Sequence, residues 1–279
     1  MRKRILLAVD LSYQVYRATA AHPNLSSRRR FTGGIYGFFT TVSKIIRETE
    51  ATDVVFCQDR KPYVRSIDYP EYKQLRKANR DEDTRELYMQ SMGYVLEALA
   101  RLQITPWGVD GYESDDMIAH CVQGYRSRFD HIYAASNDSD LFQLLWCPNF
   151  SIYSKDLASC MTGAKLMKAQ GLTPEQFMLM TAMTGTHNDV AGIDRVGPVT
   201  AKKALEQPAL MREMRAKHGA LIDRNLGIIK LPHPTFPTET RLPPQEPVNL
   251  RELYRALDEY DIDVTNAMVK AFEQMRSRP

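Results

Sequence analysis

Acidic residues stand at the ends of four apolar runs in this 279-residue chain. The runs cover 4–11, 53–57, 104–109 and 131–135, and the acids that end or follow them are Asp10, Asp59, Glu113, Asp115, Asp116, Asp138 and Asp140. In an open parallel α/β sheet the ligand site lies beyond the carboxyl ends of the strands, so we expect these carboxylates to converge on one edge. Like charges at that density repel unless cations lie between them, and hard oxygen ligands suit Mg²⁺, with Mn²⁺ as a substitute.

The number of carboxylates bears on the number of ions. One octahedral ion cannot use them all, which indicates two ions, the arrangement that clamps the attacking and leaving oxygens in phosphodiester hydrolysis. An ordinary alternative exists for Glu113, Asp115 and Asp116, because the helix dipole stabilises acids in a first helical turn. The same pattern returns at Asp138 and Asp140, and this repetition favours the metal site.

A basic segment rich in tyrosine occupies residues 60–80. Only Asp68 and Glu71 oppose its cations, which are Arg60, Lys61, Arg65, Lys73, Arg76, Lys77 and Arg80, and its rings are Tyr63, Tyr69 and Tyr72. Cations for phosphates beside rings for bases are typical of a surface that binds single strands. The alternative is a charged helical hairpin that serves only solubility.

A turn and a helix start are predicted within 190–205. Gly192 and Gly197 flank a short turn, Pro198 takes a permitted first-turn position, and Lys202 and Lys203 follow on the helix. Free backbone N–H groups and lysines at such a turn would hold duplex phosphates without reading sequence. A plain packing corner between two helices is the alternative.

The elements that position these residues alternate between strand and helix. Helical spacing of apolar residues predicts helices over 33–48, 86–102 and 113–122 and another after Asp140, between the four apolar runs. This alternation predicts an α/β fold with a mainly parallel sheet flanked by helices. Beyond about residue 150 the sequence pattern predicts mostly helices. Six prolines within 231–247 predict an extended arm, and a last helix is expected over 250–275.

Composition excludes several classes of protein. An apolar fraction of 43% and a charged fraction of 25% are those of a globular protein, and no apolar stretch approaches the roughly 20 residues of a membrane span. The four cysteines, at 57, 121, 147 and 160, lack metal-ligand spacing, which favours reduced thiols in the cytoplasm. The net charge is +3 although many acids are assigned to one cluster, so the remaining surface would be basic and would suit a polyanionic substrate; the alternative is an ordinary mixed surface.

Six motifs occur together and in order, and the chain they mark resembles the flap endonuclease-type 5′ nucleases. This family contains the bacteriophage 5′-to-3′ exonucleases and the N-terminal 5′-nuclease domain of bacterial DNA polymerases. The motifs are VDLSYQVYRA at 9–18, FCQD at 56–59, YPEYKQLRKANR at 69–80, GYESDDMIA at 111–119, SNDSDLFQLL at 136–145 and GTHNDVAGIDRVGPVTAKKAL at 185–205.

The resemblance implies a PIN-like 5′-nuclease fold. It places a catalytic domain at 1–165, with a helical arch at about 60–100, and a mainly helical DNA-binding region at 166–279, with a helix-three turn-helix at about 185–207. The implied activity is two-metal hydrolysis of 5′ flaps and nicked or 5′-ended duplexes, including RNA primers on DNA, in phage-type replication or repair. A monomer that works beside replication proteins in the cytoplasm of a bacterial or phage-infected cell is implied as well, with no membrane partner.

The resemblance also assigns residues. It implies that the first ion is held by Asp10, Asp59, Glu113, Asp115 and Asp116, and the second by Asp138, Asp140 and Asp189. Lys73 and Arg76 act on the scissile phosphate, so that Lys73, Arg76, Asp10 and Asp59 are the catalytic residues. The implied contacts with nucleic acid are Tyr72, Lys73, Arg76, Arg80, Gly192, Val196, Gly197, Lys202 and Lys203. In relatives the helix-three turn-helix often carries K⁺.

One position departs from the family pattern. Relatives have a second acid three residues before Asp189, where this chain has Thr186. We therefore expect the second ion to be held less tightly, through water or with help from His187 or Asn188. Thr186 also keeps open the alternative of a catalytically weak homologue that binds branched DNA. A PIN-type ribonuclease is a third hypothesis, but such proteins are shorter and lack the arch and the helix-three turn-helix.

Overall fold

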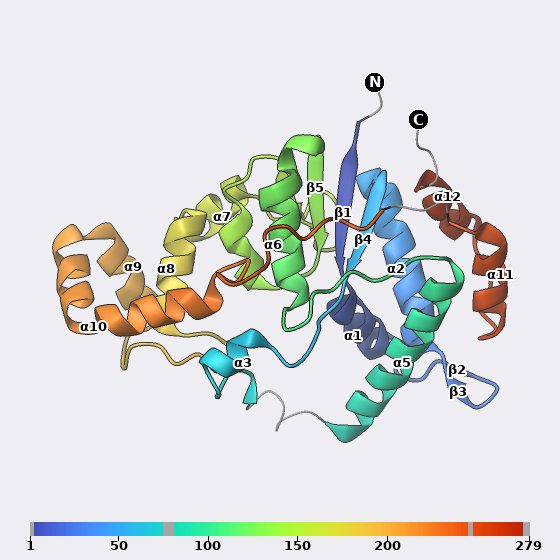
Figure 1. Ribbon diagram of the computed structural model, residues 1–279, viewed down its shortest axis with the longest axis horizontal. Helices are drawn as coiled ribbons and strands as arrows, with labels where there is room; N and C mark the ends of the chain where they lie inside the picture. The colour runs from blue at the N-terminus through green and yellow to red at the C-terminus, as the bar shows by residue number, and fades with distance from the viewer. Residues whose placement is uncertain (1–2, 75–80, 245–247, 276–279) are drawn as a thin grey trace.

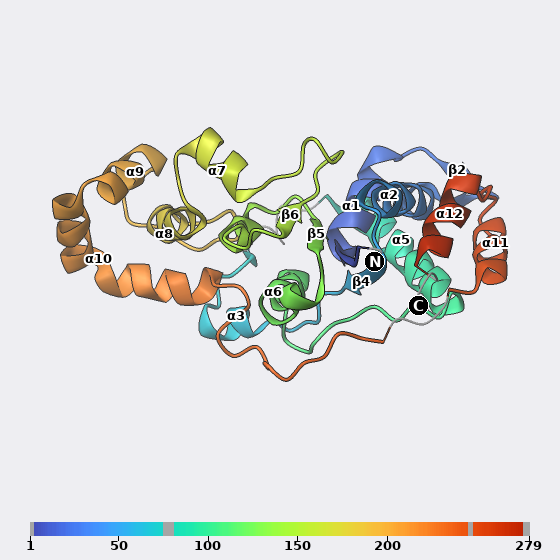
Figure 2. The ribbon, with the colours of Figure 1, turned by 90° about the horizontal axis from the view of Figure 1, so that it is seen from above.

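The computed structural model describes residues 3–74, 81–244 and 248–275. A central sheet lies between a helical region, seen at the left of Figure 1, and a second group of helices at the right. The view from above in Figure 2 shows the same order along the molecule. The start of β1 and the helix α12 both lie in the upper part of Figure 1.

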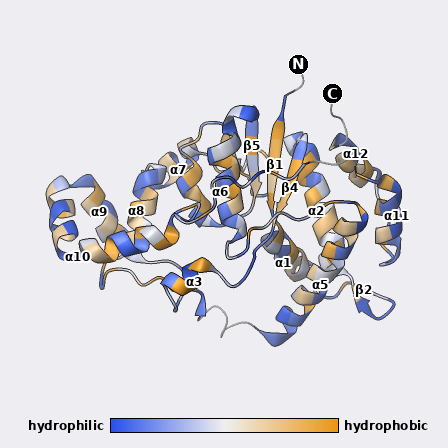
Figure 3. Ribbon diagram, in the orientation of Figure 1, coloured by the Kyte–Doolittle hydropathy of each residue, from blue (hydrophilic) through white to orange (hydrophobic). Residues whose placement is uncertain are grey.

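Four parallel strands form the central sheet in the order β4-β1-β5-β6. Their bounds are β1 (Ile5–Asp10), β4 (Asp53–Cys57), β5 (His131–Ala135) and β6 (Phe150–Ile152). Every residue of β1 is buried, and its side chains alternate between two apolar clusters on opposite faces of the sheet. This double burial explains why β1 reads as a continuous apolar run. Figure 3 shows the strands as the hydrophobic centre of the molecule.

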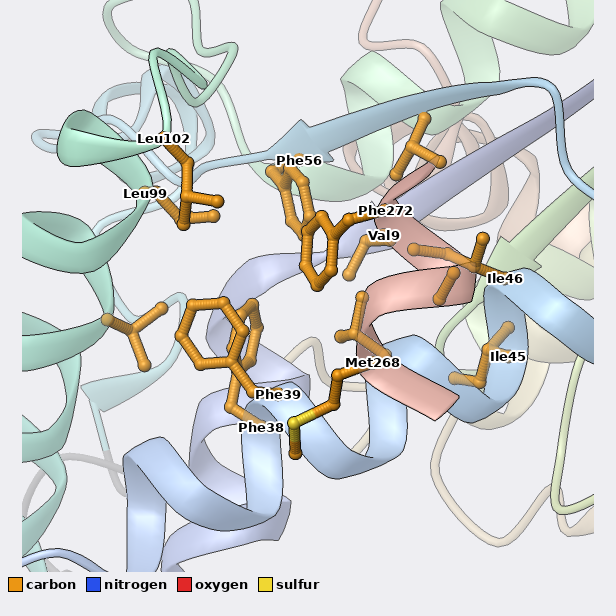
Figure 4. Packing of buried hydrophobic residues seen from close by; sticks show 14 of the residues in the cluster. Val9, Phe38, Phe39, Ile45, Ile46, Phe56, Leu99, Leu102, Met268 and Phe272 are labelled. Atoms are coloured by element: carbon orange, nitrogen blue, oxygen red, sulfur yellow. The ribbon is translucent and has the colours of Figure 1, made fainter. Parts of the chain in front are cut away.

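Five helices cover one face of the sheet. They are α1 (Leu11–Ala21), α2 (Gly33–Thr49), α5 (Glu82–Arg101), α11 (Leu250–Asp258) and α12 (Asn266–Gln274). Figure 4 shows how aromatic and aliphatic side chains of α2, α5 and α12 meet above β1 and β4. A short antiparallel hairpin joins α1 to α2, and its strands β2 (Ser26–Ser27) and β3 (Arg30–Phe31) have two residues each.

The opposite face carries α6 and shorter helices. These are α6 (Ser114–Tyr125), the 3₁₀ helices η1 (Arg126–Arg128) and η2 (Ser139–Leu144), and α7 (Gly163–Gln170). Three further helices, α8 (Pro174–Thr184), α9 (Pro198–Glu206) and α10 (Pro208–Ile229), share an apolar cluster of their own. The short helix α3 (Val64–Asp68) lies between Tyr63 and Tyr72 in the chain, and these two residues pack with Ile228 of α10 in a small cluster.

The predicted α/β class, with a mainly parallel sheet flanked by helices, is confirmed. The predicted strand over 104–109 is wrong, since only Trp107 pairs, as an isolated bridge to Cys57. Pro106 supplies no N–H for a ladder. The fourth strand of the sheet is β6 instead, and it lies in a stretch where the sequence indicated helices.

Two predicted helices differ from those observed. The segment after Asp138 is the 3₁₀ helix η2 rather than an α-helix. The predicted helix over 250–275 is broken into α11 and α12, because Asp261 has φ of 53° and Thr265 caps a new helix by accepting from the N–H of Met268. As predicted, the proline-rich segment from 231 to 244 contains no helix or strand.

Only part of the predicted 166–279 region packs as one unit. Helices α8, α9 and α10 share a cluster, whereas α11 and α12 return to the face of the sheet covered by α2 and α5. Phe272 of α12 packs beside Phe39 of α2, with ring centroids 6.0 Å apart (Figure 4). The end of the chain therefore completes the core formed by its beginning. No helix in the described ranges is both long and apolar enough to cross a membrane.

We expect Phe272→Ala to lower the free energy of unfolding by about 3–5 kcal/mol, the usual cost of emptying a buried phenylalanine site. Phe272 is fully buried, whereas Tyr254 on α11 is 49% exposed, so Tyr254→Ala is the matched control. Urea denaturation followed by circular dichroism measures both. A loss for Phe272→Ala no larger than that of the control would show that α12 is not part of the core.

Candidate active site

The carboxyl ends of three strands bring acids to one edge of the sheet. Asp10 is the last residue of β1 and lies opposite Cys57 at the end of β4, two residues before Asp59. Val9 lies opposite Ala135 at the end of β5, and Asp138 and Asp140 follow that strand. The parallel register therefore places the predicted acids of β1, β4 and β5 together.

A buried serine connects two of these acids. Ser136 donates its hydroxyl to Oδ2 of Asp10 at 3.1 Å and accepts from the backbone N–H of Asp138 at 3.3 Å. The other oxygen of Asp10 accepts from the N–H of Tyr13, which caps α1. Ser136 is fully buried and was not among the predicted site residues. Nothing in its spacing distinguishes it from an ordinary residue at the end of a strand.

The N-terminus of α6 supplies the next acids. The N–H of Ser114 donates to Asp59 at 2.8 Å, which joins α6 to the loop after β4. Glu113 caps α6, and it receives hydrogen bonds from the hydroxyl of Tyr72 at 2.9 Å and from the ammonium of Lys73. Lys73, predicted to act on the scissile phosphate, therefore lies at the acid cluster.

Burial and mutual repulsion raise the pKa values of the central carboxyls. Burial, and then the charge of Asp59, raises the pKa of Asp10 from its ordinary 3.8 to about 7. Burial and then Asp138 raise the pKa of Asp140 to about 6. The same two causes raise the pKa of Asp115 well above its usual range. The cluster therefore carries more negative charge than its surroundings compensate.

Asp115 provides the clearest sign of a ligand for this cluster. Its Oδ1 is shut off from solvent and accepts no hydrogen bond in the described structure. Asp115 and Asp140 line one small cavity together with Thr186 and Asn188. A buried carboxylate oxygen without a donor is costly, and a divalent cation would satisfy it.

Asp116 differs from the other acids. Its carboxylate is completely buried and accepts four hydrogen bonds: two from Arg65, one from the N–H of Glu113 and one from the N–H of His233. All its acceptor positions are thus used within the protein. The structure gives Asp116 a role in the fold and no open oxygen for an ion, contrary to the sequence-based assignment.

The segment around Thr186 contacts Asp138 and Asp140 through its neighbours. The Nδ2 of Asn188 donates to Oδ2 of Asp140 at 3.2 Å, and Nε2 of His187 lies 4.0 Å from Oδ2 of Asp138. Asp189 is half-buried with φ of 66°, and it is not among the described residues that line the cavity.

The predicted contacts with nucleic acid divide into three groups. Arg76 and Arg80 lie outside the described residues. Tyr72 is 6% exposed, because its ring packs with Tyr63 and its hydroxyl is held by Glu113, so it offers no open face for a base. Lys73 remains at the rim of the cluster, with 21% of its side chain exposed.

The turn before α9 is only partly open. Gly197 caps α9, and space beside its Cα is free, whereas Gly192 lies against the backbone of Thr184. Val196 joins the apolar cluster of α8, α9 and α10. On α9, Lys202 donates to the carbonyl of Gln170 at 3.0 Å. Its neighbour Lys203 is exposed, and among the predicted lysines of this helix it is the better placed for a phosphate.

The residues present fit a divalent metal ion by charge and by donor type. In the part of the chain that the structure describes, no group of three or more His, Cys, Asp or Glu side chains is positioned to hold a metal ion as it stands. The observations that favour ions are the unpartnered Oδ1 of Asp115 and the raised pKa values of Asp10, Asp115 and Asp140. Oxygen donors of this kind suit hard cations.

The site is thus a parallel sheet that collects carboxylates at its carboxyl edge, with a lysine at the rim. The chain belongs to the 5′-3′ exonuclease family. Its residues 5–173 match the family described as 5′-3′ exonuclease, N-terminal resolvase-like domain. The resemblance inferred from the six motifs is thereby confirmed.

Relatives and solved structures agree with this membership. The chain is 29% identical over 206 residues to DNA polymerase I of Treponema pallidum, a match that covers 72% of this chain and 20% of the polymerase. It is 25% identical over 205 residues to a 5′-3′ exonuclease of Buchnera aphidicola, covering 72% of this chain and 69% of that protein. The bacteriophage T5 D15 flap endonuclease, solved with DNA and metal ions, shares the fold, with a TM-score of 0.68, 19% identity and 98% coverage of both chains. The chain thus corresponds to about a fifth of the polymerase.

The raised pKa values predict an unusual pH dependence of stability in the metal-free protein. The folded state holds a proton on Asp10 up to about pH 7, whereas the unfolded chain releases it near its ordinary pKa of 3.8. Between these values the unfolded state binds fewer protons, so the contribution of Asp10 to stability is full at low pH and is lost as the pH rises.

We therefore expect Asp10→Asn, which resembles the protonated acid, to melt at the same temperature as wild type at about pH 4 and above it at about pH 8 in EDTA. Because both proteins contain all the other ionisable groups, the difference between their melting temperatures removes the pH dependence that those groups cause. Differential scanning calorimetry at several pH values measures this difference. A difference in melting temperature that stays constant with pH would contradict the assigned crowding of charges.

Proposed function

We propose that this chain is a structure-specific 5′ nuclease that hydrolyses phosphodiester bonds in branched or 5′-ended DNA with two Mg²⁺ ions. The observation that carries the proposal is the meeting of buried carboxylates at one sheet edge, with Oδ1 of Asp115 unpartnered. The T5 flap endonuclease of the same fold was solved with DNA and metal ions. Family membership makes a 5′ end the natural substrate.

The proposed ligands are taken from the family's motifs and from the acids at the cluster. Asp10, Asp59, Glu113 and Asp115 would hold the first ion, and Asp138, Asp140 and Asp189 the second. Bound Mg²⁺ supplies positive charge for the attacking and leaving oxygens of the phosphate. Mn²⁺ shares the preference for oxygen donors and would substitute. We leave Asp116 out of this set because its oxygens are fully hydrogen-bonded.

The protein's own cations bind and orient the phosphate. Burial, the largest single cause, would lower the pKa of Lys73, but the charge and hydrogen bond of Glu113 together with the charges of Asp59 and Asp115 raise it above its ordinary value, so the ammonium stays protonated. A fixed cation beside the phosphate stabilises the charge that develops as the bond breaks. Arg76 is proposed to act with it. Lys203 and the N-terminus of α9, which Gly197 caps, would hold the duplex at a distance from the cut.

The proposal extends to RNA primers on DNA and to a role in replication or repair beside other replication proteins. The bacterial relatives, one a separate exonuclease and one a polymerase, support this setting in the cytoplasm of a bacterial or phage-infected cell. The turn from Gly192 to Lys203 is proposed as a helix-three turn-helix that can carry K⁺. The arch proposed at about 60–100 would include Lys73 and most of α5, and residues 75–80 within it lie outside the described residues.

A catalytically weak protein that holds branched DNA is the second candidate. Thr186 favours it, because the second ion loses one carboxylate. The presence of both Asp138 and Asp140, with a raised pKa at Asp140, favours an active enzyme.

Asp140→Asn separates the two candidates. We expect wild type to cut a labelled 5′ flap in Mg²⁺, and the variant to lose at least about 100-fold in rate while it binds DNA as before, since charge for the ions is removed without loss of shape. Asp258→Asn, at an exposed position on α11, is the control. Flap, nicked and single-stranded substrates should be digested side by side. Wild type that binds flaps without cutting them would support the weak binder instead.

Thr186→Asp tests the assignment of the second ion. We expect the variant to reach half-maximal cleavage at a lower Mg²⁺ concentration, because the missing carboxylate is restored at a cavity it shares with Asp140. Thr238→Asp, on the exposed arm, controls for charge alone. Superimposable Mg²⁺ titrations of wild type and Thr186→Asp would refute the assignment. A Mn²⁺ preference that His187→Ala abolishes would show that His187 fills the gap.

A further inference from the structure

Arg65 of α3 uses every N–H of its guanidinium. Nε donates to the carbonyl of Ile228 at 2.9 Å. Nη1 donates to Glu113 at 3.1 Å and to Asp116 at 2.6 Å, and Nη2 donates to Asp116 at 2.8 Å and to the carbonyl of Lys230 at 3.1 Å. The residue is 3% exposed. Five donors thus meet five acceptors, which a planar, rigid fork can do and a lysine cannot.

The acceptors come from two parts of the molecule that the proposed function uses differently. Glu113 and Asp116 lie at the start of α6, where Glu113 faces the acid cluster. The carbonyls of Ile228 and Lys230 lie at the C-terminal end of α10, where backbone carbonyls lack partners within the helix. Arg65 therefore connects the acid cluster to the C-terminal end of α10.

A second set of hydrogen bonds holds the C-terminal end of α10. The amide of Gln143, in η2, donates to the carbonyl of Ile229 at 2.9 Å and accepts from the N–H of Leu231 at 2.9 Å. Residues 228–231 are thus held by Arg65 and Gln143 together. This segment is where α10 passes into the proline-rich arm beside the cavity lined by Asp115 and Asp140.

We propose that Arg65 is a positioning residue that fixes the distance between the duplex-binding helices and the metal-binding carboxylates. The inference rests on the proposed function, in which α8, α9 and α10 hold the duplex. A duplex held by these helices can present only one phosphate to the acid cluster as long as α10 cannot slide. Arg65 thereby determines which phosphodiester bond is cut.

The chemistry of the contact also predicts which substitution is informative. Removal of the side chain would leave Asp116 buried and uncompensated, which endangers folding. Arg65→Lys keeps the charge beside Asp116 and Glu113 but cannot hold both carbonyls of α10, since an ammonium is a compact point charge. Gln143→Met removes the second connection and leaves all carboxylates in place.

The test compares wild type, Arg65→Lys, Gln143→Met and the control Arg101→Lys in single-turnover cleavage of an end-labelled flap resolved to one nucleotide. Arg101 likewise bridges two carboxylates, Glu97 and Glu259, on the far side of the molecule. We expect Arg65→Lys to lower the cleavage rate by about 10- to 100-fold and to spread cuts over neighbouring phosphates, while duplex affinity changes little. Gln143→Met should spread the cuts in the same way with a smaller loss of rate.

Each outcome decides the proposal. Circular dichroism establishes that the variants fold, and where Arg65→Lys does not, Gln143→Met decides alone. A single cut position, as in wild type, with unchanged rate would overturn the inference and leave the proposed function standing. A loss confined to duplex affinity would do the same, because it would make Arg65 a part of the binding surface. Wild type that cuts no substrate would overturn both.

Discussion

Repulsion among buried carboxylates is the constraint on which the rest of this structure depends. Asp10 ends β1, Asp140 follows β5 and Asp115 lies at the start of α6, and burial makes their charges costly. A fold can keep such a group only by surrounding it with compensating cations or by leaving it to bind ions. This molecule does both. Arg65 and Lys73 compensate the charges of Asp116 and Glu113, whereas Oδ1 of Asp115 accepts no hydrogen bond in the described structure.

The fold supplies the rigidity that such crowding needs. The strand β1 is buried on both faces, so the carboxylate at its end cannot move away from Asp59. The last helix closes the core above β1, where Phe272 meets Phe39, and thus the C-terminal residues support an edge of the sheet far from them in sequence. Stability and activity are opposed here, because the charges that would hold ions destabilise the metal-free fold.

The sequence predicted the sheet and most of the cluster for a simple reason. Doubly buried parallel strands are apolar runs, and acids at their ends stand out against them, as at Asp10 and Asp138. Shorter signals failed: β6 has three residues, and Pro106 and Gly108 interrupt the run that was predicted as a strand. Ion pairs between residues far apart in the chain could not be predicted from the sequence either. Nothing local distinguishes Asp116, which binds Arg65, from Asp115, whose Oδ1 has no donor, because the distinction depends on a residue 51 positions away in the chain.

We infer that the protonated carboxyl groups at the sheet edge form a site for divalent ions. Titration of the apo protein with Mn²⁺ at about pH 6.5, by calorimetry in two buffers of different ionisation enthalpy, tests this most directly. We expect saturable binding that releases protons, because ions displace them from Asp10 and Asp140, and we expect Asp115→Asn to lose the tightest site. Binding without proton release, or the same titration curve for wild type and Asp115→Asn, would contradict it.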